Sequence, residues 1–132
     1  MKLVATEPGS DEARTHIKES LEKGYTLYTV NMALAEGLNA IWKHVKIHKD
    51  LNLEDANSTI QDLTNVYSKL KILTIRELCE QASKIAFTYN TTIYDALYVA
   101  AAEKVKATLY TADQKFHNKA KKVISSELLK PS

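Results

Sequence analysis

Polar and hydrophobic positions alternate between helical and extended spacing along the chain. Apolar residues four positions apart predict a first helix that Ser10 or Asp11 caps and Gly24 ends. The aromatic and β-branched residues at 25–30 then predict a strand. Asn31 is expected to cap the next helix. A helix followed at once by a strand is the first sign of a mixed fold.

The second helix is predicted to pack on two sides. One buried face follows the i, i+4, i+7, i+8, i+11 pattern through Leu34, Leu38, Ile41, Trp42 and Val45. Small residues on another face would let a neighbouring element approach closely; they are Ala33, Gly37 and Ala40.

The rest of the chain continues the alternation. The predicted elements are a helix at 53–70, a strand at 71–75, helices at 77–89 and 93–105, a strand at 107–111, a short basic helix at 113–122 and a last strand at 123–125. Strands that alternate with helices of this length predict a three-layer α/β fold with a mainly parallel central sheet flanked by helices. Ligands of such sheets gather beyond the carboxyl ends of the strands.

Composition narrows the class of protein without giving its function. A chain of 132 residues suits one domain, and 45% hydrophobic with 26% charged residues is ordinary for a globular protein. The longest apolar run is far short of the roughly 20 residues that cross a bilayer. With no export signal in the first residues and a lone Cys79, we expect no membrane span and a cytoplasmic location. A net charge of +2 excludes bulk attraction to a polyanion, so any nucleic-acid contact must be local.

Three acidic residues lie where a parallel sheet places ligands. Glu36 follows the strand at 25–30, Asp95 opens the helix at 93–105, and Asp113 follows the strand at 107–111. Taken singly, each has a structural explanation. Asp95 fits a capping box that begins at Thr92, Asp113 fits a helix cap, and Glu36 fits a solvated helix face.

Taken together, the three segments resemble the PIN-domain family of ribonucleases found as toxins in toxin–antitoxin pairs. The segments are LAEGLN at 34–39, TTIYDALYVA at 91–100 and LYTADQKF at 109–116. The resemblance runs over nearly the whole chain, and the ordered set of three is more specific than any one segment.

The resemblance implies a divalent-metal-dependent endoribonuclease that uses Mg²⁺ or Mn²⁺. Glu36, Asp95 and Asp113 would be metal ligands and catalytic residues, and the Thr111 hydroxyl would assist. Hard cations of this kind prefer oxygen ligands, and a bound metal can turn water into a nucleophile at a phosphodiester. We expect the three carboxylates to meet in one pocket at the carboxyl edge of the sheet. The implied partners are an RNA substrate, a small antitoxin and a second copy of the chain.

One position of the family pattern does not match. In relatives an Asp ends the first, central strand, upstream of a segment similar to 2–13 of this chain. We therefore expect the first strand to be missing or altered and the reading frame to extend upstream of Met1. Alternatively, residues 2–6 take the central position and Glu7 replaces the Asp. The missing acid keeps open a catalytically inactive PIN scaffold that binds RNA or an antitoxin, and a generic α/β binding domain without metal is the third interpretation.

Two further features are weaker signals. His44 and His48 are spaced to share a metal, but without a third ligand they fit a solvated, Lys-rich face better. Four lysines close to Asp113 are candidate phosphate contacts, although such runs are usually solvated; they are Lys115, Lys119, Lys121 and Lys122.

Overall fold

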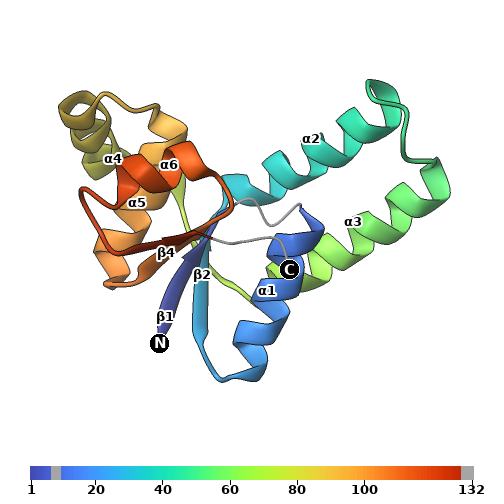
Figure 1. The fold of residues 1–132 in the computed structure, drawn as a ribbon, viewed down its shortest axis with the longest axis horizontal. Helices are drawn as coiled ribbons and strands as arrows, with labels where there is room; N and C mark the ends of the chain where they lie inside the picture. The colour runs from blue at the N-terminus through green and yellow to red at the C-terminus, as the bar shows by residue number, and fades with distance from the viewer. Residues whose placement is uncertain (7–9, 129–132) are drawn as a thin grey trace.

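The architecture is a parallel sheet covered by helices (Figure 1). The computed structural model describes residues 1–6 and 10–128. The five strands pair in the order β3-β2-β1-β4-β5, all parallel: β1 (Lys2–Ala5), β2 (Thr26–Val30), β3 (Lys71–Leu73), β4 (Thr108–Thr111) and β5 (Ser126–Leu128). The helices are α1 (Asp11–Glu22), α2 (Met32–Lys46), α3 (Leu53–Ser68), α4 (Ile75–Tyr89), α5 (Ile93–Val105) and α6 (Gln114–Ala120). The predicted α/β fold class is confirmed.

The central strand β1 corrects one expectation from the sequence. Leu3 and Val4 pair with β2 on one side and with β4 on the other, so the central position is filled. The Thr29 hydroxyl also donates to the Ala5 carbonyl at 2.8 Å. The expectation of a missing first strand is therefore wrong, and the alternative, in which this segment takes the central position, is confirmed for Lys2–Ala5. Glu7, the suggested replacement for the family Asp, lies outside the described residues.

The two faces of the sheet have separate cores. Val4, Val30 and Leu109 point to the face that α5 covers, where the largest cluster of buried residues lies. Leu3 and Leu27 point to the opposite face and pack with Ile17 of α1 and Val66 of α3. This period-two alternation is what a strand buried on both sides requires. The predicted three layers are therefore present.

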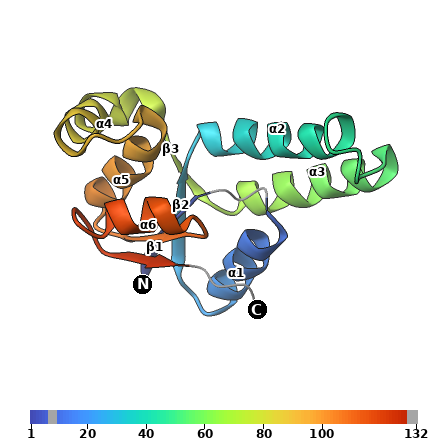
Figure 2. The same cartoon turned by 45° about the horizontal axis from the view of Figure 1, so that its top comes forward.

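Helices α2 and α3 form an arm that extends beyond the sheet (Figures 1 and 2). They run side by side, and a third cluster of Ile41, Ala56 and Leu63 joins them. The predicted buried face of α2 is only partly right, because Leu38 and Trp42 remain exposed. This part of α2 lies beyond the sheet, so α3 packs against it and the sheet does not.

Several element boundaries differ from the sequence prediction for local reasons. The strand at 71–75 ends at Leu73 because Thr74 caps α4 in a capping box with Glu77. The last strand was predicted at 123–125, but β5 begins at Ser126. The N–H groups of Val123 and Ile124 both donate to the Ala120 carbonyl, so these β-branched residues complete the turn after α6.

Candidate active site

The three acidic residues lie at the carboxyl edge of the sheet. Glu36 is in the second turn of α2, directly after β2, and Asp113 caps α6 directly after β4. Asp95 is in the first turn of α5. Because the other end of α5 leads straight into the start of β4, this first turn lies at the edge where β4 ends. The topology thus brings one acid from each of three elements to the same edge.

Asp113 is held by two local hydrogen bonds. Its Oδ1 accepts the N–H of Phe116 at 3.1 Å, so the helix-cap interpretation is confirmed. Its own N–H donates to the Thr111 hydroxyl at 3.1 Å, and Thr111 is fully buried. A carboxylate has about four lone-pair sites, so one cap hydrogen bond leaves others for a ligand. The cap therefore does not exclude a second role.

The charges of the other two carboxylates act on the pKa of Asp95. Thr92 caps α5 by accepting the Asp95 N–H at 3.1 Å. Burial raises the pKa of the Asp95 carboxyl, the negative charges of Asp113 and Glu36 raise it further, and Lys119 lowers it. A group whose charge is opposed by burial and by two like charges is well suited to a cation. The three carboxylates therefore share one electrostatic environment.

Glu36 is the acid with a hydrogen bond from another element. The Tyr98 hydroxyl of α5 donates to Glu36 Oε1 at 2.7 Å. The solvated-face interpretation of Glu36 is therefore incomplete, because one carboxylate oxygen is hydrogen-bonded although the residue is exposed. This contact turns one side of α2 toward the helix that contains Asp95.

A cleft of about 700 Å³ lies beside Glu36. It is formed by the start of α1 together with α2 and α3, and its acidic residues are Asp11, Glu12, Glu36 and Asp50. Asp95 and Asp113 are not among its described lining residues. This cleft is therefore not shared by the three acids, and their meeting in one pocket stays a prediction.

The three carboxylates are oxygen donors, and the described residues contain no complete metal site. Within residues 1–6 and 10–128, no three His, Cys, Asp or Glu side chains are close enough together to hold a metal ion. Opposed, partly buried carboxylates are nevertheless the oxygen donors that Mg²⁺ selects, and Mg²⁺ usually keeps several waters between itself and the protein. Asp95, Asp113 and Glu36 are therefore candidate donors for such an ion.

Thr6 follows the end of β1, where relatives are expected to have an Asp. It is 2% exposed, and its hydroxyl has no hydrogen-bond partner in the described part of the chain. An unpaired buried hydroxyl costs on the order of 1–3 kcal/mol. Because a hydroxyl brings no negative charge, Thr6 does not replace an acid electrostatically.

Comparison with known proteins identifies the family of the chain. The PIN domain family matches residues 2–122. The chain belongs to the PIN-domain family. Ribonuclease VapC3 from Pyrobaculum aerophilum is 30% identical over 117 residues, which cover 89% of this chain and 86% of that protein.

Solved structures share the fold of this PIN domain. PAE2754 from Pyrobaculum aerophilum has a TM-score of 0.72 and 22% identity, covering 95% of this chain and 89% of that one. VapBC2 from Rickettsia felis, bound to a DNA fragment from its promoter, has a TM-score of 0.68 and 16% identity, covering 98% and 100%.

Four lysines of the PIN domain lie on and after α6. Lys115, Lys119, Lys121 and Lys122 are all exposed. Lys119 is the lysine whose charge reaches Asp95, where it lowers the carboxyl pKa against the effect of burial. A phosphate contact for these lysines stays a prediction.

The two histidines of the arm form no described metal site. His44 Nδ1 is 2.9 Å from Asp50 Oδ1, and the hydrogen bond from His44 lowers the pKa of that carboxyl. The His44 and His48 rings are 5.2 Å apart, and both residues are exposed. Among the described residues, no third ligand completes a set with them.

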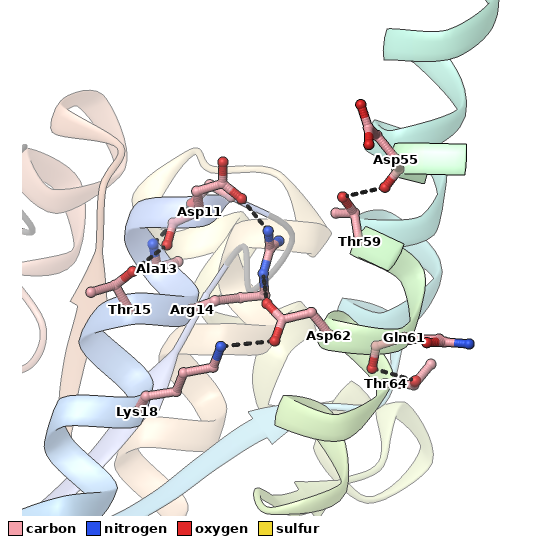
Figure 3. A network of polar contacts seen from close by, with 11 residues as sticks. Asp11, Ala13, Arg14, Thr15, Lys18, Asp55, Thr59, Gln61, Asp62 and Thr64 are labelled. Carbon is pink, nitrogen blue, oxygen red and sulfur yellow. Dashed lines mark hydrogen bonds and ion pairs between the residues drawn. The ribbon is translucent and has the colours of Figure 1, made fainter. Parts of the chain in front are cut away.

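An ion-pair network joins α1 to the arm (Figure 3). Arg14 is 4% exposed, its Nε donates to Asp62 at 2.8 Å, and it also pairs with Asp11. Lys18 donates to the other oxygen of Asp62 at 2.7 Å. Arg14 and Asp62 were not singled out in the sequence, because nothing in the local pattern relates residues that are 48 positions apart.

No helix in the described ranges is long and apolar enough to cross a membrane.

Proposed function

We propose that this PIN domain is a divalent-metal-dependent endoribonuclease and the toxin of a toxin–antitoxin pair. The observation that supports it most is the shared environment of Asp95, Asp113 and Glu36, which come from three elements at one edge of the sheet. The similarity to a relative named as a ribonuclease gives the substrate class.

Glu36, Asp95 and Asp113 would hold Mg²⁺ or Mn²⁺ at this edge. When bound, such an ion lowers the pKa of a water and neutralises charge on the phosphodiester. In the hydrolysis a water oxygen bonds to phosphorus, a P–O ester bond breaks and the released oxygen takes up a proton. Thr111 positions Asp113 through the backbone N–H, and Lys119 adds positive charge beside Asp95 where the RNA backbone would lie.

The proposed antitoxin partner is argued from the similar solved structures. VapBC2 from Rickettsia felis was solved on promoter DNA, and a similar antitoxin is our proposed partner.

For the second copy of the chain, we propose the surface at the junction of α4 and α5. Phe87 is 86% exposed there and Tyr94 is 66% exposed. Large apolar side chains with such exposure favour an interface.

One observation favours the alternative of an inactive scaffold. Thr6 follows β1, where the resemblance to the family leads us to expect an Asp, so the described site has three acids and lacks that one. An inactive scaffold would keep the fold and the antitoxin surface but would not cleave RNA. The two proposals therefore differ in a single measurable property.

The deciding experiment compares the wild-type chain with Asp113→Asn. Asparagine keeps an oxygen that can cap α6, so the substitution removes charge while leaving the cap in place. We expect the wild type to cleave a single-stranded RNA oligonucleotide with Mg²⁺ or Mn²⁺ and to stop when a chelator is added. The variant should lose cleavage by about 10²-fold or more, with an unchanged melting temperature.

Two controls make the comparison specific. Asp55→Asn, at the start of α3 and away from the site, should cleave like the wild type. Equal cleavage by wild type and Asp113→Asn would reduce Asp113 to a helix cap and contradict the metal site. A folded wild type that cleaves no RNA with either ion would favour the inactive scaffold.

A further inference from the structure

Tyr98 contacts parts of all three acidic segments. It lies on α5 one turn after Asp95 and is 4% exposed. Its hydroxyl donates to Glu36 Oε1 at 2.7 Å, which joins α5 to α2 across 62 positions of the sequence. No pattern in the sequence singles out this contact, because the signature around Tyr98 reads as an apolar helix face.

The ring of Tyr98 extends the connection to the third segment. It packs against Phe116, with ring centroids 6.5 Å apart and planes inclined by 54°. Phe116 is the residue whose N–H donates to Asp113 Oδ1. The hydroxyl end of Tyr98 thus contacts one acid, and its ring contacts the residue that holds another.

A buried tyrosine hydroxyl always needs a partner, so the hydrogen bond alone is not informative. The choice of partner is informative here. Glu36 is an exposed residue with a flexible side chain, and holding that side chain in one rotamer costs conformational entropy. A backbone carbonyl would satisfy the hydroxyl without that cost.

We propose that Tyr98 is a positioning residue that orients the Glu36 carboxylate for a divalent cation. The inference rests on the proposed metal-dependent function. One hydrogen bond occupies one lone-pair site of the carboxylate and leaves others for the ion. Partners of this kind orient ligands, and their loss typically lowers metal affinity by about 10–100-fold.

The test uses Tyr98→Phe in the full chain, which keeps the ring against Phe116 and removes only the hydroxyl. We expect Mn²⁺ affinity, measured by calorimetry without RNA, to fall by about 10-fold or more. The Mn²⁺ concentration for half-maximal RNA cleavage should rise by the same factor. The matched control is Tyr25→Phe, the same substitution on a partly buried tyrosine just before β2 at the opposite edge of the sheet, which should change neither quantity.

A second measurement reports on Glu36 itself. Side-chain scalar couplings in NMR should show one Glu36 rotamer in the wild type and averaged rotamers in Tyr98→Phe. Glu36→Gln keeps an oxygen for the Tyr98 hydroxyl, so it should retain the single rotamer and still bind Mn²⁺ weakly. Adding Tyr98→Phe to Glu36→Gln should then weaken Mn²⁺ binding little further, because both changes act on one ligand.

The outcomes separate this inference from the function on which it rests. If the wild type binds Mn²⁺ and Tyr98→Phe binds it equally tightly, Tyr98 is only a core residue and the proposed function stands. If Glu36 keeps a single rotamer in Tyr98→Phe, the positioning role is also overturned. A wild type that binds no Mn²⁺ overturns the proposed function and the inference together.

Discussion

Asp95 combines a structural position with an electrostatic cost. Its carboxylate is in the first turn of α5, where the helix dipole favours a negative charge by about 0.3–1 kcal/mol. Burial and the charges of Asp113 and Glu36 act in the opposite direction and raise its pKa. A folded state that resists ionisation of this group is under strain at neutral pH, and a bound cation would relieve that strain.

This balance predicts a pH dependence of stability. Because the folded-state pKa of Asp95 is above its unfolded value, the folded protein binds the proton more tightly. The stability of the wild type relative to Asp95→Asn should therefore fall as pH rises from the unfolded value of 3.8 through the raised folded value, and then level off. Urea unfolding of both proteins across this range, without divalent ions, measures the difference.

Metal ions supply the control for this prediction. Adding Mn²⁺ at neutral pH should stabilise the wild type and leave Asp95→Asn nearly unchanged, because a ligand stabilises the state that binds it. Parallel pH curves for the two proteins would show that Asp95 is not in the repulsive environment described above.

At the scale of elements, α1 contacts the arm in two ways. Ile17 packs with Val66 of α3 in the apolar cluster, and Arg14 and Lys18 form the polar network with Asp62. Arg14 is almost fully buried, while the Asp62 side chain is 38% exposed. Loss of Asp62 would remove one of the carboxylates that pair with this buried cation.

We expect Asp62→Asn to lower the free energy of unfolding by about 1–2 kcal/mol. This is less than the roughly 3–5 kcal/mol for breaking a fully buried pair, because Asp62 is partly solvated. The control is Glu80→Gln, which removes an exposed pair with Lys84 at 3.9 Å and should cost less than about 0.5 kcal/mol. Urea denaturation measures both variants.

The same pair predicts how acid acts on the arm. The hydrogen bond from Lys18, followed by that from Arg14, lowers the pKa of Asp62 although burial opposes the shift. Stability from this carboxylate is therefore present above its unfolded pKa and is lost as pH falls through the folded value. Asp62→Asn should show a shallower loss of stability in acid than the wild type, and an unchanged acid limb would contradict the network.

At the scale of the whole molecule, helices α4 and α5 form the side opposite the arm (Figures 1 and 2). Their buried faces contribute to the main core, while the exposed side chains at their junction include Phe87, Tyr89, Ile93 and Tyr94. The surface proposed for the second copy of the chain therefore lies on the side of the molecule away from the arm.

The proposed homodimer predicts the effect of one surface substitution. Phe87→Ser should shift the sedimentation coefficient from dimer toward monomer and leave the melting temperature of the monomer unchanged, since this side chain contributes little to the core. Leu53→Ser, on the exposed arm, is the matched control and should remain dimeric. A wild type that is monomeric at all concentrations would contradict the homodimer.

The sequence by itself determined the features that depend on neighbours within a few residues. Ser10, Thr92 and Asp113 cap the helices that their positions predict, because a side chain and an N–H three residues later meet within one turn. The order of the elements from α1 onward followed from periodicity, and the acids Glu36, Asp95 and Asp113 were singled out by ordered motifs that place them after strands or at a helix start.

Only the tertiary structure decided contacts between distant segments. Residues 2–5 form the central strand because β2 and β4 both offer backbone N–H and C=O groups that pair with them. No local pattern in the sequence shows this double pairing. Asn31, expected to cap α2, instead accepts the N–H of Ile75 at the start of α4. The hydrogen bond of Tyr98 to Glu36 and that of Arg14 to Asp62 likewise arise when packed helices bring remote polar groups together. A buried polar group must find a partner somewhere, but only the packing of the whole chain determines which one is within reach.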